Sequence, residues 1–177
     1  MKEVILKNNK MLIIRELNPD DAVEVLKYTS NVGSETDFLT FGSEGVSYTI
    51  DQEKIFLRNT QETKRNYMIG GFIDDHLVSV VNIASSQKDR LSHKSDIGIS
   101  VLKEFWNMGV GSSMMEFIIS LCRKDNFRKI DLLVNEENER AIKLYEKYGF
   151  IKEGLLSRDI QIDGVFYSSY HMGLKLD

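Results

Sequence analysis

The sequence predicts an α+β fold with a mixed, mainly antiparallel central sheet flanked by helices. The expected order of strands and helices gives a sheet with helices packed against it. One strand–helix–strand passage, at residues 94–134, implies a single parallel pair of strands. The pair Asp163-Gly164 lies between two apolar alternations and predicts an antiparallel hairpin.

Each element has a local signal. Pro19 follows Asn18, a suitable helix cap, and marks a helix start. Asp74-Asp75 forms a turn between two strands, and Gly149 is typical of a helix stop. The expected elements are a strand at 11–17, helices at 19–30 and 48–62, strands at 66–73, 76–85 and 94–101, a helix at 109–124, a strand at 129–134, a helix at 138–148 and the hairpin strands 160–162 and 165–167.

Length and composition are those of a soluble globular protein. The 177 residues suit one domain, spanning 1–177. Hydrophobic residues make up 42% of the chain, and no apolar run approaches the roughly 20 residues that cross a bilayer. The first residues lack the features of a signal peptide. The single Cys122 lies in an apolar helix, which predicts a buried structural thiol in a reducing cytoplasm.

Charge and histidine placement argue against two kinds of partner. The net charge is −4, and no basic surface typical of nucleic-acid binding is visible. An acidic balance suits an amine substrate, although a solvated acidic surface explains it equally well. The histidines His76, His93 and His171 are scattered, so we expect no metal site.

A glycine pair follows the apolar strand at 94–101. Gly109 and Gly111 stand between this strand and an apolar helix. Glycine lets a backbone turn tightly and approach a ligand closely. The first amides of a helix have no partner within the helix, so such a junction binds phosphate readily. The segment predicts a phosphate-bearing cofactor, although glycine at such junctions often serves geometry alone.

A second segment places three side chains on one helical face. Asn138, Ala141 and Tyr145 are spaced by three and four residues in the expected helix at 138–148. This helix follows directly after the strand at 129–134. A polar, a small and an aromatic side chain therefore line up beside the end of that strand.

Together the two segments resemble the acyl-CoA-binding motif and the following strand–helix of the GNAT family of N-acetyltransferases. The family loop, Arg/Gln-x-x-Gly-x-Gly/Ala, corresponds to residues 106–111. Trp106 replaces the Arg/Gln, as in the branch with ribosomal-protein and spermidine N-acetyltransferases, whereas Asn107 stands where that branch often has glycine. The family's later signature, Asn-x-x-Ala-x-x-Leu-Tyr-x-x-x-Gly-Phe, is matched by Asn138, Ala141, Leu144, Tyr145, Gly149 and Phe150.

The resemblance implies the acyl-CoA N-acyltransferase fold, in which two central strands splay apart and admit the pantetheine arm of acetyl-CoA. The cofactor-binding residues implied in this way are Ile99, Ser100, Val101, Trp106, Asn107, Met108, Gly109, Val110, Gly111, Ser112, Asn138 and Tyr145. Asn138 also suits a helix N-cap. Arg140 and Lys143 could reach the ribose phosphate of the cofactor or simply face solvent.

Catalytic and acceptor residues are expected on three segments. Tyr145 is the candidate acid for the leaving thiolate, or else a core tyrosine. Asp96 is the candidate general base, with Glu35 and Glu44 as others. Each also suits a solvated surface position, and water removes the proton in many members of the family that the chain resembles. Acceptor selectivity is expected from residues 35–42, with Glu35, Phe38 and Phe41 as substrate-binding residues, and from the hairpin around Asp163. Both phenylalanines also suit core positions.

The resemblance implies a cytoplasmic N-acetyltransferase that uses acetyl-CoA by direct attack in a ternary complex. The acceptor is a small-molecule amine, a polyamine or a protein N-terminus, and the family suggests a homodimer. A non-catalytic acyl-CoA-binding or sensing module is the alternative, which the presence of Tyr145 and Asn138 disfavours. A nucleotide-binding protein of doubly wound type would need repeated parallel strand–helix units, and the terminal hairpin does not suit it.

Overall fold

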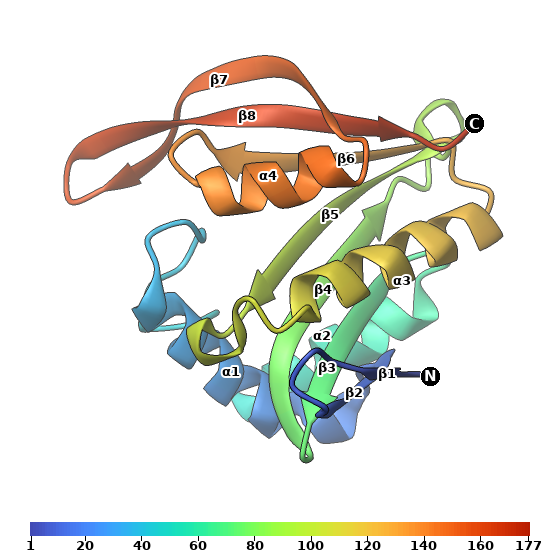
Figure 1. The fold of residues 1–177 in the computed structure, drawn as a ribbon, viewed down its shortest axis with the longest axis vertical. Helices are drawn as coiled ribbons and strands as arrows, with labels where there is room; N and C mark the ends of the chain where they lie inside the picture. Colours follow the sequence, from blue (N-terminus) through green and yellow to red (C-terminus); the bar gives the residue numbers. More distant parts are fainter. The chain divides into compact units, whose positions relative to one another are not determined.

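The computed structural model describes residues 1–177 (Figure 1). In chain order the elements are β1 (Lys2–Ile5), β2 (Met11–Glu16), η1 (Pro19–Asp21), α1 (Ala22–Glu35), α2 (Ile50–Glu62), β3 (Tyr67–Ile73), β4 (His76–Ser85), η2 (Asp89–Leu91), β5 (Lys94–Val101), η3 (Lys103–Phe105), α3 (Val110–Lys124), β6 (Lys129–Asn135), α4 (Glu139–Lys147), β7 (Ile151–Ile162) and β8 (Val165–Lys175), where η marks 3-10 helices.

The chain forms two compact units. Unit 1 comprises Met1–Ala84 and Ile99–Phe117, and unit 2 comprises Ser85–Gly98 and Ile118–Asp177. Strand β5 and helix α3 each contribute one part to unit 1 and one part to unit 2. The single domain expected from the length stays a prediction.

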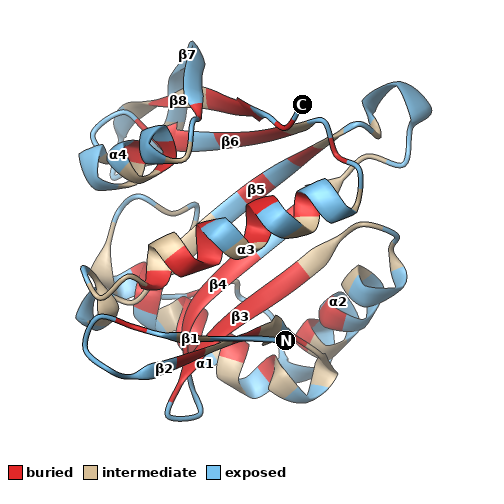
Figure 2. Ribbon diagram, turned by 45° about the vertical axis from the view of Figure 1, so that its right-hand side comes forward, coloured by how far each residue is buried: buried red, intermediate tan, exposed pale blue.

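In unit 1, strands β1 to β4 form an antiparallel sheet in sequence order. Helices α1 and α2 pack against β3 and β4 through a core of apolar side chains. Burial runs along both of these strands, drawn in red in Figure 2. The buried members of this core are Leu17, Ala22, Val25, Tyr28, Val32, Leu57, Met68, Phe72, Leu77 and Val80.

In unit 2, β5 pairs with β6 in parallel, and β6, β8 and β7 are antiparallel neighbours. The β5–β6 pairing covers residues 94–96 and 129–131. Both strands continue beyond these residues, as expected for strands that splay apart. Strand β7 is mostly exposed, drawn pale blue in Figure 2. The predicted α+β fold with a mixed, mainly antiparallel sheet is confirmed.

Both predicted turns are confirmed by their backbone angles. Asp74 and Asp75, between β3 and β4, have φ of 51° and 63°, and Asp163 and Gly164, between β7 and β8, have 48° and 83°. Two successive residues of positive φ are typical of the tight hairpin turn that matches strand twist. The cap at Asn18 is also confirmed, since its side chain accepts a hydrogen bond from the Asp20 amide at 2.9 Å.

Some boundaries differ from the prediction. Helix α1 continues to Glu35 rather than ending at residue 30, and it passes through Gly33. A Cβ at Gly33 would collide with the carbonyl oxygen of Gly42, so the glycine lets a neighbouring segment lie against the helix. Strand β1 was not predicted, because it is short and mostly exposed and so lacks a clear alternation.

Candidate active site

The connection between β5 and α3, in unit 1, has the backbone shape of an anion site. Asn107 and Gly109 have φ of 64° and 99°, in the left-handed region. Glycine adopts this region freely, and asparagine tolerates it better than most residues. Asn107 can therefore adopt the left-handed conformation at this turn without a glycine. These two positive φ values turn the connection sharply between β5 and α3.

The start of α3 is suited to negative charge. The first amides of a helix have no acceptor within it. The Ser113 amide donates to the Gly109 carbonyl at 2.9 Å, and the amides of Val110 and Gly111 precede this bond. No acidic residue lies in the first turn of α3, whereas α1 and α4 each carry one there and α2 carries two. A phosphate group therefore fits this helix start.

The turn between β1 and β2 supports this loop within unit 1. The Lys7 amide donates to the Met108 carbonyl at 3.4 Å, and the Asn8 amide group donates to the Met108 sulfur at 3.2 Å. A Cβ added at Gly109 would lie 3.9 Å from the Leu6 side chain, which is van der Waals contact. These contacts fix Met108 and hence the loop backbone beside it.

The end of β5 is tied to its surroundings by side chains. The Ser79 hydroxyl donates to the Ser100 carbonyl at 2.7 Å, and the Trp106 indole donates to the Val101 carbonyl at 2.8 Å. Each of these carbonyls thus uses one of its two lone pairs within the protein. Trp106 therefore joins the loop to the end of β5. The predicted residue Ile99 belongs to the same end of β5, in unit 1.

Helix α1 contacts the same strand end. The hydroxyl groups of Tyr28 and Ser100 lie 2.9 Å apart, and the Glu35 carboxylate accepts a hydrogen bond from the Lys103 amide at 2.7 Å. Burial is the main cause that raises the pKa of Tyr28, so this phenol keeps its proton. Glu35, expected at the acceptor, has one oxygen engaged by the backbone of η3.

The other expected acceptor residues lie on the segment between α1 and α2. Phe41 is partly buried and packs against the core of unit 1, whereas the Phe38 side chain is 38% exposed. The Glu44 carboxylate accepts from the Gly42 amide at 2.8 Å, and this hydrogen bond lowers its pKa. Glu44 is thus adapted to holding its own loop rather than to accepting a proton.

Unit 2 carries the remaining predicted residues. Asn138 caps α4, its side-chain oxygen accepting from the Ala141 amide at 3.1 Å. Tyr145 is 6% exposed, and its ring lies 5.8 Å from that of Phe150, centre to centre. Burial raises the pKa of Tyr145 above its ordinary value. Asp96 is exposed on β5, and Lys143 pairs with Glu139 at 3.0 Å on the solvent side of α4.

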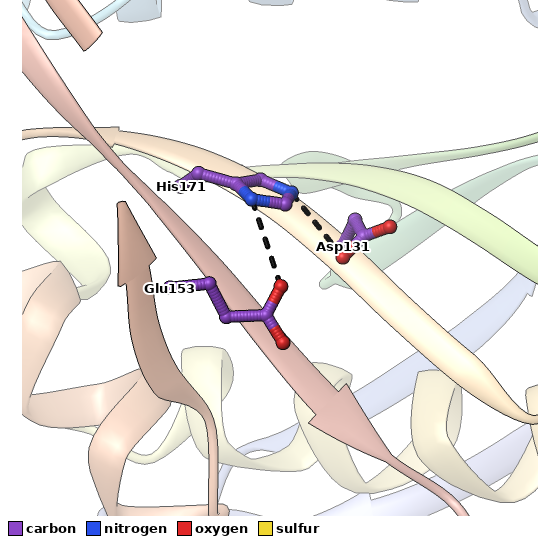
Figure 3. Close-up of side chains that lie close together, drawn as sticks. All are labelled: Asp131, Glu153 and His171. Atoms are coloured by element: carbon purple, nitrogen blue, oxygen red, sulfur yellow. Dashed lines mark ion pairs between the residues drawn. The ribbon is translucent and has the colours of Figure 1, made fainter. Parts of the chain in front are cut away.

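A cluster that the sequence did not reveal lies on the sheet of unit 2. Figure 3 shows the His171 imidazole between the carboxylates of Asp131 and Glu153, at 3.2 and 3.7 Å. The three residues come from β6, β8 and β7. Asp131 has no exposed side-chain surface. The available signal was the alternation of Lys129 and Asp131 with the apolar residues of β6.

These three side chains have the ligand types of a metal site. However, the Lys129 ammonium lies 2.7 Å from Asp131 and 2.6 Å from Glu153, and the Lys94 ammonium lies 2.8 Å from Asp131. A lysine thus already stands between the two carboxylates, and two lysines balance their charge. Burial raises the pKa of Asp131, but hydrogen bonds from Lys129 and Lys94 outweigh it and hold the pKa below its usual range. We interpret the cluster as an ion-pair network.

The architecture is that of the acyl-CoA N-acyltransferases. A structure of a GNAT acetyltransferase from Streptococcus pneumoniae is 32% identical, covers 94% of this chain and 99% of its own, and superimposes with a TM-score of 0.89. The yncA structure from Salmonella typhimurium, solved with its cofactor acetyl-CoA, is 14% identical with a TM-score of 0.81 over 94% of both chains, and so shows the fold alone.

A family model described as the acetyltransferase (GNAT) family matches residues 35–150, so the chain belongs to this family. The L-amino acid N-acetyltransferase AaaT of Escherichia coli is 37% identical over 103 residues, which is 56% of this chain and 62% of that protein. The chain thus spans less than two thirds of that curated relative. The ribosomal-protein and spermidine branch, the cytoplasmic location and the homodimer stay predictions. None of the helices is both long and apolar enough to span a bilayer.

Proposed function

We propose that this protein transfers the acetyl group of acetyl-CoA to a primary amine by direct attack in a ternary complex. The observation that carries this proposal is the β5–α3 connection. Its backbone turns at Asn107 and Gly109 and leads into a helix start that lacks acidic residues. Such a loop suits the pyrophosphate of CoA. The name of the E. coli relative makes amino acids the first acceptors to test.

Acetyl transfer from a thioester to an amine requires few groups of the protein. Bound acetyl-CoA supplies an activated acyl group: a nitrogen–carbon bond forms, the carbon–sulfur bond breaks, and the amine loses a proton to water or a base. The protein must stabilise the charge that develops on the thioester oxygen. In our proposal the Val101 amide donates to this oxygen, and Ile99 and Ser100 bind the pantetheine amides. Asp96 remains the proposed base, and its carboxylate is exposed on β5.

Tyr145 is the proposed donor to the leaving sulfur. Because burial raises its pKa above its ordinary value, full proton transfer to a thiolate, whose conjugate acid has a pKa of about 8.5, is uphill. A hydrogen bond that strengthens as the thiolate forms is the more favourable role. Asn138 would add a contact to the pantetheine arm from its side-chain amide group, because its oxygen serves the helix cap.

The test measures thiol released from acetyl-CoA with L-amino acids, polyamines and N-terminal peptides as acceptors. We expect release that depends on one of these amine classes. A thermal shift with acetyl-CoA serves as a binding check, because ligand at 100 times its Kd adds about 2.7 kcal/mol of stability. Binding without thiol release on any acceptor would instead support a sensing module.

The substitution Tyr145→Phe tests the leaving-group role. It removes only the hydroxyl, and we expect kcat to fall by on the order of 10²–10⁴-fold while acetyl-CoA still binds. The matched control is Tyr148→Phe, one turn along the chain at the end of α4. Turnover close to the parent value in Tyr145→Phe would show that this tyrosine belongs only to the core.

A further inference from the structure

Two side chains of α1, Tyr28 and Glu35, form hydrogen bonds near the end of β5, where the proposed thioester site lies. Tyr28 and Glu35 are seven residues apart, which places them on one face of the helix, with the buried Val32 between them. Tyr28 shares a hydrogen bond with Ser100, and Glu35 accepts from the Lys103 amide at 2.7 Å. Helix α1 therefore contacts the chain on both sides of Val101.

The same strand end is fixed from other directions within unit 1. The Leu102 amide donates to the Val78 carbonyl at 3.0 Å. As described above, Ser79 and Trp106 donate to the carbonyls of Ser100 and Val101. Each residue from Ser100 to Lys103 thus has a hydrogen bond to another part of unit 1. Such bonds restrict the direction of the Val101 amide, and direction governs how well a donor stabilises a developing charge.

Glu35 differs from the other residues that hold this strand end, because it carries a carboxylate and lies where α1 meets the segment 35–42. It is the last residue of α1, and the acceptor segment follows directly. That segment also lies along α1, since the Ser30 hydroxyl donates to the Ser43 carbonyl at 2.7 Å and Gly33 faces Gly42. From the sequence, this carboxylate is expected to bind the acceptor amine or to take its proton. The short bond to the Lys103 amide gives it a defined partner already.

We propose that Glu35 is a positioning residue, an inference that rests on the proposed function. Its carboxylate accepts a hydrogen bond from the Lys103 amide and thereby orients the end of β5, including the Val101 amide, for acetyl transfer. Tyr28 is the second positioning residue on the same helix face. Neither side chain needs to contact the acceptor amine. A neutral group that accepts the same hydrogen bond can therefore replace the carboxylate. A general base could not be replaced in this way, because a neutral amide does not take up the proton.

The test compares Glu35→Ala with Glu35→Gln. Glu35→Ala loses the bond, and we expect kcat to fall by on the order of tenfold or more, because small misplacements of catalytic groups carry such costs. The Kd for CoA should change much less than kcat, since the loop at Asn107–Ser112 that would hold the pyrophosphate is untouched. Glu35→Gln keeps an acceptor oxygen and should restore kcat with an unchanged pH profile. Glu24→Ala, earlier on the same helix, is the matched control.

Hydrogen exchange supplies a readout that needs no activity. The Lys103 amide should exchange slowly in the parent and in Glu35→Gln, and faster in Glu35→Ala. Loss of activity in Glu35→Gln equal to that in Glu35→Ala would overturn the proposal in favour of a base or an amine ligand, as would unchanged activity and exchange in Glu35→Ala. Absence of thiol release from the parent with every acceptor would count against the proposed function, while the exchange result would still judge the positioning bond.

Discussion

Two buried carboxyl groups, Asp131 on β6 and Glu53 on α2, respond to burial in opposite ways. Asp131 has no exposed side-chain surface, yet the neighbouring Lys129 and Lys94 hold its pKa below the usual range. Glu53 is only 2% exposed and lies one turn before Leu57 on the inner side of α2, where burial alone raises its pKa to about 7. The comparison teaches that nearby cations, rather than depth, decide whether a buried carboxyl is charged at neutral pH.

The largest effect that tests this contrast is expected for Asp131→Ala. Removing the carboxylate leaves two lysines without their shared partner, and breaking a buried ion pair from one side costs about 3–5 kcal/mol. Urea unfolding at pH 7 measures this loss. Because the pKa of Asp131 is lowered in the folded state, its contribution is complete above the unfolded pKa of about 3.9 and disappears as the pH falls through the folded value.

The control for this prediction is the exposed pair of Arg128 and Asp177, whose side chains are 69% and 70% accessible. Arg128→Ala should change the free energy of unfolding by less than about 1 kcal/mol, as exposed pairs contribute little. If Asp131→Ala cost no more than Arg128→Ala, the cluster would not act as a buried network. Asp131→Asn, which keeps the side-chain shape, covers the case in which the alanine variant does not fold.

Glu53→Gln is expected to stabilise the protein at pH 8 by on the order of 3–4 kcal/mol. The folded pKa of about 7 lies above the unfolded value of about 4.3, so deprotonation opposes folding. The parent therefore loses stability as the pH rises from about 4.3 to about 7. The variant should not lose it, and the two should have similar stability at pH 4.

Thermal unfolding from pH 4 to pH 8 checks this difference. Glu62→Gln, at the exposed end of the same helix, is the control for removing a carboxylate from α2 and should change the free energy of unfolding by less than about 0.5 kcal/mol. Parallel stability curves for the parent and Glu53→Gln would show that a cation or water already stabilises the Glu53 carboxylate, which would remove the contrast with Asp131.

The smallest expected effect is at Gly173 of β8. An added Cβ would lie 2.5 Å from Oε1 of Glu153 and 2.9 Å from the Lys129 side chain, so the pair must shift. Gly173→Ala should cost about 1 kcal/mol in urea unfolding, as mild overpacking does. Gly154→Ala on β7 meets no atom within 4 Å and should be near neutral. Equal effects of the two substitutions would mean that the Glu153–Lys129 contact contributes little.

The fold was largely predictable because its signals are local. The turns at Asp74-Asp75 and Asp163-Gly164 follow from residues that accept positive φ, and the cap at Asn18 needs only its immediate neighbours. The extension of α1 through Gly33 was not predictable in this way. There the reason is a segment from later in the chain that lies against the helix.

The candidate site divides in the same manner. The tight turn at the proposed phosphate site follows from Gly109 and the helix after it, which are adjacent in sequence. The bond from Glu35 to Lys103 joins residues 68 positions apart, and the network at Asp131 brings together three strands. The first contact depends on how distant segments pack and the second on sheet register, and neither composition nor periodicity specifies these.

The irregularities of β7 have a consequence for solubility. One extra residue, Glu153, interrupts the pairing with β8 between Lys152 and Gly154, and a second irregularity falls between Leu156 and Ile160. A long, regular edge strand with the exposed apolar residues Ile151, Leu155 and Leu156 would offer a template for other chains. The two bulges break that template, so the residue that completes the ion-pair network also protects the sheet edge from aggregation.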